Sequence, residues 1–115
     1  MLIFGLDFIN NKKIGFNNDS KIQCIDFDEK NIKENSAVFC NDINEILIAN
    51  ALNAAFIIPN KSILNDCVNL AEYYLFDSKI LSLVKTKEEL FKAAKLKCDA
   101  VFVCEYNEKY KEYFL

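Results

Sequence analysis

Hydrophobic and polar positions in the first third of the chain follow the period of a β-strand. Residues 2–9 (LIFGLDFI) put every second side chain on the same face, which predicts a strand that ends at the polar turn 10–13 (NNKK). Residues 14–16 (IGF) are predicted to pair back as a short hairpin. Residues 21–27 (KIQCIDF) predict another strand, and the polar segment 28–36 predicts a surface loop or one helical turn.

From residue 37 onward, short apolar runs alternate with segments of helical spacing. The apolar runs, each predicted to be a strand, are residues 37–40, 54–58, 79–84 and 100–103. The predicted helices are residues 41–53, 61–76, 87–97 and 105–114. The clearest is 61–76, whose apolar positions form one stripe: Ile63, Leu64, Cys67, Val68, Leu70, Ala71, Tyr74 and Leu75. This stripe is predicted to be the buried face of the helix.

The alternation of strands and helices predicts the fold class. Such a pattern is typical of right-handed βαβ crossovers and a largely parallel sheet, and apolar strands indicate that both faces of the sheet are covered. We expect one α/β domain over residues 1–115, β-rich in 1–36 and alternating in 37–115. Its sheet is predicted to be mixed but mostly parallel, with about four to six strands, Rossmann-like or flavodoxin-like βαβ units and an N-terminal hairpin or meander.

Composition narrows the classes of function. The chain has 115 residues, 52% of them hydrophobic, which is enough for one core. Its net charge is −3 and all 14 basic residues are Lys, which argues against binding to nucleic acid or to an anionic membrane. His and Arg are absent, so the usual general base, the commonest metal ligand and the bidentate phosphate clamp are missing. The sequence therefore favours a protein that is not an enzyme and predicts no cofactor and no metal.

Cysteine usage and the lack of targeting segments suggest a cytoplasmic protein. The five Cys residues are an odd number without close pairs, and the sequence has neither a secretory leader nor an apolar run long enough to span a membrane. Cys67 falls on the predicted buried stripe. Cys40 and Cys104 end predicted strands, where a thiolate would be favoured if it were exposed near a helix N-terminus. Without His, a Cys nucleophile is disfavoured.

The Lys85-Thr86 pair follows an apolar strand, as the last residues of a phosphate-binding loop do. Such loops need glycine, and residues 16–115 contain none. The TKEE motif (86–89) instead predicts a capping box, in which Thr86 accepts from the Glu89 N–H and the Glu89 carboxylate returns to the Thr86 N–H. Asp42 and Glu45 repeat the arrangement, and Asn60 is the predicted cap of the helix over 61–76. With only two glycines, we expect Asn residues to take the left-handed positions of the backbone.

A binding site remains possible where the strands end. Ligands of open α/β sheets sit outside the carboxyl ends of the strands, and helix N-termini together with Lys side chains suit a small anion there. The candidate ligand-binding residues are Asn41, Asp42, Asn60, Lys61, Ser62, Lys85, Thr86 and Glu105. The alternative interpretation is that they cap helices or are solvated. Residues 26–29 (DFDE) offer paired carboxylates for acid–base chemistry, or simply a solvated turn.

The last predicted helix carries a stripe of aromatic residues. Tyr106, Tyr110, Tyr113 and Phe114 share one face, either to close one side of the sheet or to contact a partner. Together with the missing His, Arg and glycine loops, this stripe favours a first hypothesis, a non-enzymatic interaction or regulatory module that works through a protein partner or as a homo-oligomer. The second hypothesis is a binder of a small anionic metabolite at the strand ends.

One segment resembles part of a known family. Residues 79–103 (KILSLVKTKEELFKAAKLKCDAVFV) are similar to a βαβ unit of the phosphate-binding (β/α)8 barrels. The resemblance implies a strand, a covering helix and a second parallel strand. It carries no motif, because the Gly-rich phosphate loops of that family are missing and the chain is too short for eight such units. No family is assigned from it.

Overall fold

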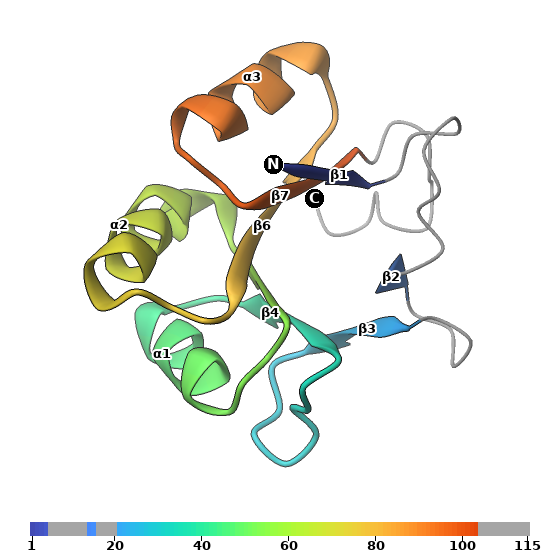
Figure 1. Cartoon of the computed structure of the whole chain (residues 1–115), viewed down its shortest axis with the longest axis vertical. Helices are drawn as coiled ribbons and strands as arrows, with labels where there is room; N and C mark the ends of the chain where they lie inside the picture. Colours follow the sequence, from blue (N-terminus) through green and yellow to red (C-terminus); the bar gives the residue numbers. More distant parts are fainter. Residues whose placement is uncertain (5–13, 16–20, 104–115) are drawn as a thin grey trace.

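The computed structural model describes residues 1–4, 14–15 and 21–103, which form one sheet with helices packed on it (Figure 1). The strands are β1 (Leu2–Phe4), β2 (Ile14–Gly15), β3 (Ile22–Asp26), β4 (Ser36–Cys40), β5 (Phe56–Pro59), β6 (Lys79–Val84) and β7 (Ala100–Val103). The helices are α1 (Ile43–Ala51), α2 (Leu64–Tyr74) and α3 (Lys87–Lys95), and a 3₁₀ turn, η1 (Lys61–Ile63), leads into α2. None of these described helices is long and apolar enough to cross a membrane.

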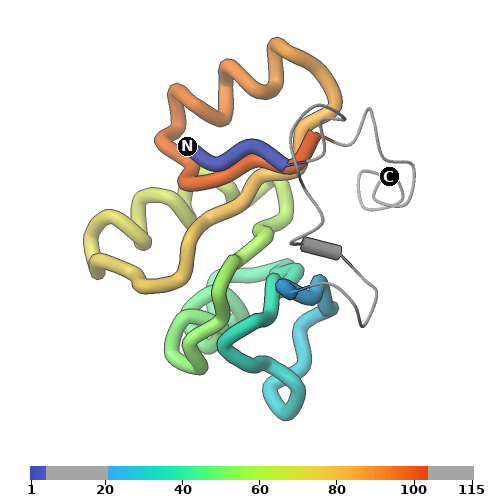
Figure 2. The backbone as a smooth tube through the Cα atoms, turned by 45° about the vertical axis from the view of Figure 1, so that its right-hand side comes forward, coloured from blue at the N-terminus to red at the C-terminus, as the bar shows by residue number. Residues whose placement is uncertain are grey.

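The sheet is Rossmann-like, and every strand in it runs parallel to its neighbours. Its order is β1-β7-β6-β5-β4-β3-β2, so each strand from β2 to β6 lies next to the one that follows it in sequence. Figure 2 shows the curl of the chain, with β1 and β7 side by side at one edge. The order from β2 to β7 does not reverse, so no crevice between diverging crossovers marks a ligand site in advance.

All three helices cover the same face of the sheet (Figure 1). Right-handed crossovers between strands in consecutive order pass on one side, which explains this arrangement. The core beneath the helices joins strand and helix side chains, among them Val38, Cys40, Ile46, Ala49, Ile57, Cys67, Val68, Ile80, Ala93 and Val101. The predicted buried stripe of α2 is confirmed at Cys67 and Val68. Tyr74 and Leu75 are exposed instead, because the helix ends there.

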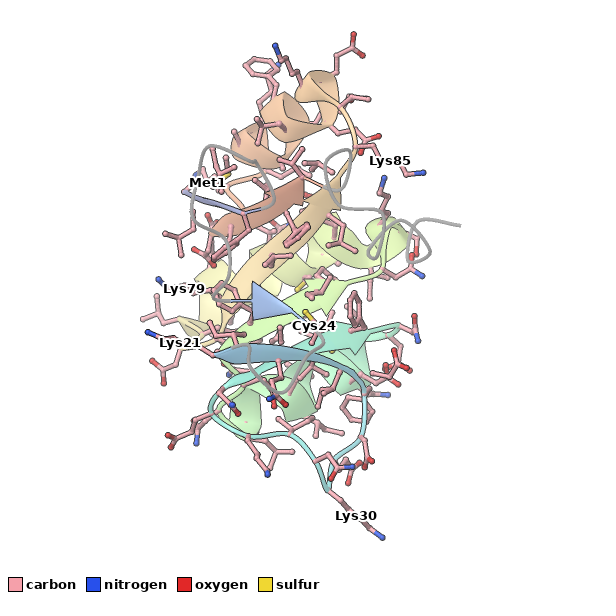
Figure 3. The ribbon with its side chains drawn as sticks, turned by 90° about the vertical axis from the view of Figure 1, so that its right-hand side faces the viewer. Met1, Lys21, Cys24, Lys30, Lys79 and Lys85 are labelled. Carbon is pink, nitrogen blue, oxygen red and sulfur yellow. The ribbon has the colours of Figure 1, made fainter. Side chains whose placement is uncertain are left out.

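The opposite face of the sheet is buried as well. Its cluster consists of Phe4, Cys24, Ala37, Phe56, Ile58, Leu81, Leu83, Ala100 and Phe102, all of them strand residues. Phe4 and Phe56 meet edge to face, with ring centroids 5.9 Å apart. Figure 3 is turned to show this side of the molecule, with Cys24 near its centre. Burial on both faces confirms what the apolar strands predicted.

The predicted N-terminal hairpin is wrong. Strands β1 and β2 lie at opposite edges of the sheet, where β1 pairs with β7 and β2 pairs with β3, in both cases in parallel. The backbone N–H of Leu2 also donates to the carbonyl of Asp99, 3.0 Å away, which fixes the start of β1 beside β7. An alternating pattern is the same in parallel and antiparallel strands, so the pattern did not identify the partner. With both edge strands, the sheet formed by the described residues has seven strands rather than four to six.

Each helix ends in a residue with left-handed backbone geometry. These residues are Asn53, Leu75 and Lys97, with φ of 64°, 53° and 65°. The prediction that Asn takes such positions is confirmed at Asn53 only. At Leu75 and Lys97 a side chain with a Cβ atom occupies a position that favours glycine, which adds local strain.

Candidate functional site

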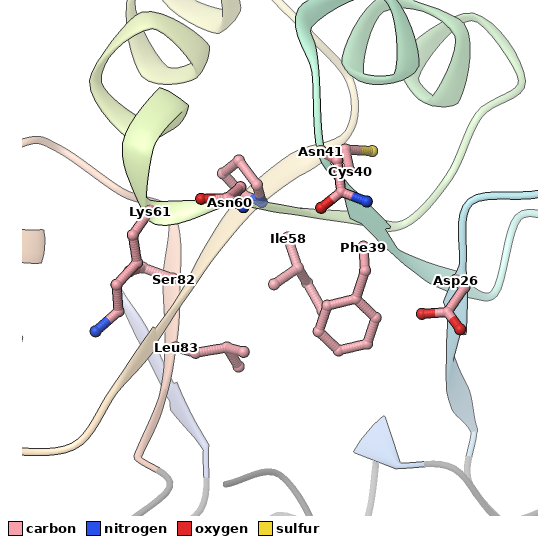
Figure 4. Close-up of a pocket in the computed structure, with 10 residues that line it drawn as sticks. Asp26, Phe39, Cys40, Asn41, Ile58, Asn60, Lys61, Ser82 and Leu83 are labelled. Carbon is pink, nitrogen blue, oxygen red and sulfur yellow. The ribbon is translucent and has the colours of Figure 1, made fainter. Parts of the chain in front are cut away.

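A cavity of about 240 Å³ opens at the carboxyl ends of β3, β4, β5 and β6. At this edge the parallel strands end and the crossover connections begin, so residues far apart in the sequence meet there. Its lining consists of Asp26, Phe39, Cys40, Asn41, Ile58, Pro59, Asn60, Lys61, Ser82 and Leu83. Figure 4 shows these side chains around the opening.

The cavity has an apolar floor and a polar rim. Phe39, Ile58 and Leu83 form the floor, because the pleat of β4, β5 and β6 turns these side chains away from the helices. The register supports the contact, since Phe39 is the direct partner of Ile58 across the β4–β5 ladder. Polar residues stand where the strands stop: Asp26 ends β3 and Asn41 follows β4. An apolar surface with a few convergent polar groups is typical of sites for small molecules.

Asn60 and Lys61 turn the chain from β5 into η1. Pro59 ends the strand, and the Asn60 side chain then accepts a hydrogen bond from the backbone N–H of Ser62 at 3.1 Å. Asn60 thus forms a cap as predicted, but it caps the 3₁₀ turn η1, whereas α2 begins after Ile63 without a side-chain cap. Lys61 reaches toward α3, where its ammonium group lies 3.2 Å from the carboxylate of Glu89. Both side chains remain partly exposed to solvent, so the ion pair itself adds little stability.

Glu89 is held in its charged form. Partial burial by itself would raise the pKa of this carboxyl, but the hydrogen bonds from the Lys85 N–H and the Lys61 ammonium, together with the charges of both lysines, lower the pKa below its usual 4.5. Lys61 therefore faces a carboxylate on the α3 side and the cavity on the other. This single cation connects the rim of the cavity to the start of α3.

The starts of α1 and α3 are capped by the predicted residues. Thr86 accepts from the Glu89 N–H at 3.1 Å and Asp42 accepts from the Glu45 N–H at 2.9 Å, so both caps are confirmed. The returning bond differs from the expected capping box. Each glutamate accepts from the residue before the cap: Glu89 from the Lys85 N–H at 3.0 Å, and Glu45 from the Asn41 N–H at 2.8 Å. The Lys85-Thr86 pair thus begins a helix.

The structure brings some of the predicted ligand-binding residues together and leaves others apart. Asn41, Asn60 and Lys61 line the cavity. Four of the remaining residues lie at the same edge without lining it, and their described hydrogen bonds belong to helix starts: Asp42, Ser62, Lys85 and Thr86. Glu105 lies outside the described residues, as do the predicted contact residues Tyr106, Tyr110, Tyr113 and Phe114.

Sequence reasoning missed Asp26 as part of this rim. Asp26 was considered only with its neighbours in the acidic segment 26–29, but it ends β3 as Asn41 and Asn60 follow β4 and β5. Asp26 carries the same signal as the other candidates, namely a polar residue at the carboxyl end of a predicted strand. The expectation that residues 1–27 form a hairpin or meander set this strand apart from the parallel sheet and so hid the signal. Asp28, two residues on, instead organises the following turn through the Lys30 N–H, 3.1 Å away.

The thiols near the site are not poised for reaction. Burial raises the pKa of Cys40 to about 12, and Glu45 adds to the shift. Burial likewise raises the pKa of Cys67 to about 12 and that of Cys98 to about 11. Cys40 is buried, so the exposure that would favour a thiolate there is not present, while Cys104 lies outside the described residues. Over the part of the chain that the structure describes, no three Cys, Asp or Glu side chains come together as metal ligands.

Comparison with known proteins adds no further guide to function. No model of a known protein family matches the sequence, and no curated protein is similar to it.

Proposed function

We propose that this chain binds a small metabolite with a carboxylate or phosphate group, in the cavity at the carboxyl ends of β3 to β6. The observation that carries the proposal is the cavity itself, about 240 Å³ in volume, in which Asn41, Asn60 and Lys61 meet above an apolar floor. The volume suits a metabolite of a few heavy atoms rather than a nucleotide or a peptide. Two amides and one ammonium group supply hydrogen-bond donors for an anionic end.

The charge at the middle of this edge favours an anion. The first turns of α1 and α3 carry acidic residues, Glu45 in one and Glu88 and Glu89 in the other, which offset the positive ends of those helices. The first turn of η1, which borders the cavity, carries no acidic residue and contributes Lys61. An anionic ligand there would meet the Lys61 ammonium group, which it would share with the carboxylate of Glu89 on α3.

Thermal unfolding in the presence of small phosphates and carboxylates tests the proposal. A ligand present at about ten times its Kd stabilises the fold by about 1.4 kcal/mol, which for a domain of this size is a rise in Tm of about 5 °C. We expect such a rise in the wild type, its loss in Lys61→Met, and its retention in the matched control Lys79→Met. Lys79 is an exposed lysine at the opposite, amino end of β6.

Two results would refute binding at this site. One is the absence of any rise in Tm across the panel at millimolar concentration. The other is an equal rise in Lys61→Met and in the wild type, which would place the ligand elsewhere. Because Lys61 also pairs with Glu89, the Tm of each variant without ligand serves as its own reference.

A second candidate function, self-association, is favoured by an exposed aromatic surface on the helices. Tyr73 and Tyr74 at the end of α2 are 76% and 62% exposed, and their rings meet edge to face with centroids 4.8 Å apart. Tyr73 also borders an open groove between α1 and α2 that contains Ile43 and Leu70. Exposed aromatic side chains of this kind are enriched in protein interfaces.

A second copy of the chain is the partner that this surface suits. The exposed residues of α1 are Asn44, Leu47 and Ala51, none of which is charged, so two copies of this helix can meet around a twofold axis without repulsion between these residues. The charged residue in the lining of the groove is Asp66 of α2. We expect sedimentation equilibrium to show a dimer in the wild type and a monomer in Tyr73→Glu. The control Phe91→Glu, which changes an exposed aromatic side chain on α3, should remain a dimer. A wild-type chain that stays monomeric at high micromolar concentration would exclude self-association.

A further inference from the structure

The rim of the cavity carries opposite charges at its two ends. Asp26 contributes a carboxylate from the end of β3, and Lys61 contributes an ammonium group from η1. Figure 4 shows the two side chains on opposite sides of the opening, with Ile58 and Phe39 between them. Asn41 and Asn60 stand along the same edge and add neutral amides. A ligand that spans the cavity therefore meets a negative group, an apolar surface and a positive group in turn.

Asp26 is the carboxylate in the described lining of the cavity, and it has no structural role among the described residues. Asp42, Glu45 and Glu89 each accept a hydrogen bond from a backbone N–H at a helix start. The Asp26 carboxylate, which is exposed, accepts no hydrogen bond and forms no ion pair with any residue that the structure describes. Its charge is thus available to a ligand in the cavity.

We infer that the ligand carries both charges, with a protonated amine at the Asp26 end and a carboxylate or phosphate at the Lys61 end. This inference rests on the proposed function. The two ends are separated by the apolar floor, so the amine and the anion are separated by a short aliphatic segment rather than attached to one carbon. The class is that of ω-amino acids and their phosphate analogues. A purely anionic ligand would instead place its apolar end next to the charge of Asp26.

The opposite charges of Asp26 and Lys61 predict which of two related ligands binds more tightly. Hydrogen bonds between charged partners are the stronger ones in proteins, so we expect an ω-amino carboxylate to bind about tenfold or more tightly than the alkyl carboxylate that lacks the amine. Replacing Asp26 by Asn removes the negative charge and keeps the shape. In Asp26→Asn, the ω-amino carboxylate loses this advantage, whereas the simple carboxylate binds as well or better because repulsion from Asp26 is gone.

Isothermal titration calorimetry on the whole chain tests this with three probe series. The series are ω-amino carboxylates of four to six carbons, n-alkyl carboxylates of the same length, and n-alkylamines of the same length. Each series is measured on the wild type, on Asp26→Asn and on the control Asp77→Asn, whose exposed carboxylate precedes β6 at the far end of the sheet. We expect the ω-amino preference in the wild type and in Asp77→Asn, and its loss in Asp26→Asn.

The outcomes separate this inference from the proposed function. If simple carboxylates bind in a Lys61-dependent way but the amine adds nothing, the inference is wrong and anion binding stands. The same holds if the amine helps equally in Asp26→Asn. If no probe in any series binds, the inference and the carboxylate form of the proposed function fail together. A preference that depends on both Asp26 and Lys61 supports both.

Discussion

Leu75 ends α2 in a conformation that should make glycine the most stable residue at that position. Its backbone is left-handed (φ 53°, ψ 56°), and its N–H donates to the carbonyl of Ala71, a bond that any residue can form. The left-handed conformation costs a residue with a Cβ atom about 1–2 kcal/mol. Glycine avoids that cost, which is why it is the residue most often found directly after helices.

Two losses oppose the gain. Glycine gives up about 0.5–1 kcal/mol more conformational entropy on folding than alanine does. The Leu75 side chain is 83% exposed, so its removal forfeits only about a sixth of the burial energy of a leucine, about 0.3–0.5 kcal/mol. Leu75→Ala loses the same contacts but keeps the strained backbone. We therefore expect Leu75→Gly to be about 0.5–1 kcal/mol more stable than Leu75→Ala, with the wild type between them.

Urea unfolding followed by far-UV circular dichroism, at one fixed protein concentration, measures these differences. For a domain of this size, the expected difference in the free energy of unfolding between the two variants would appear in thermal unfolding as a difference of about 3 °C in Tm. The pair Asn53→Gly and Asn53→Ala, at the end of α1, serves as a comparison: Asn tolerates the left-handed region, so glycine should gain less over Asn53 than over Leu75. A Leu75→Ala protein as stable as Leu75→Gly would refute the account of strain at this helix end.

Three further predictions concern the helix starts and the buried thiols. Thr86→Ala should lower the free energy of unfolding by about 1 kcal/mol in urea without changing ligand-induced rises in Tm, because Thr86 caps α3 and does not line the cavity. The raised pKa values of three buried thiols mean that the unfolded chain releases their protons first as pH rises. Stability should therefore fall by about 1 kcal/mol per thiol from pH 8 to pH 10, and in Cys67→Ala the fall should be smaller by about that amount. The pKa of Glu89 is lowered in the folded state, so its contribution is present above the unfolded value and is lost as pH falls through the folded one. Acid unfolding of Glu89→Gln should accordingly show a weaker pH dependence than that of the control Glu88→Gln.

Local structure was largely predictable from the sequence, because local rules determine it. The caps at Asp42, Asn60 and Thr86 follow from short polar side chains placed directly before apolar periodic segments, and all three form. The strands after residue 37 follow from apolar runs that only burial on both faces explains. The exception is the end of α2, where Leu75 continues the apolar stripe but leaves the helix. The spacing of apolar residues gives no signal for the position at which the backbone becomes left-handed.

Strand pairing was not predictable from the same pattern. The alternation in residues 2–4 fits any neighbour, and a hairpin with the next strand is the commonest solution for adjacent strands. What places β1 beside β7 is a contact over nearly the whole chain, including the bond from the Leu2 N–H to the Asp99 carbonyl. A local pattern in residues 2–4 carries no information about a partner at residues 100–102, so this pairing could not be read from the strand itself.

The composition of the candidate site follows from this arrangement. In a parallel sheet whose strands follow one another in sequence order, the carboxyl ends of neighbouring strands lie at the same edge. Each strand contributes its last side chain on the face opposite the helices and the polar residue with which the crossover begins. Phe39 and Ile58 are cross-strand partners, and they supply the floor; Asp26, Asn41 and Asn60 end or follow three successive strands and supply the rim. Capping accounts for Asn60, but no described helix start or turn uses the side chains of Asp26 and Asn41. Among the described residues that line the cavity, these two polar side chains have no capping role, so substitutions of Asp26 and Asn41 should change what binds while leaving the sheet intact.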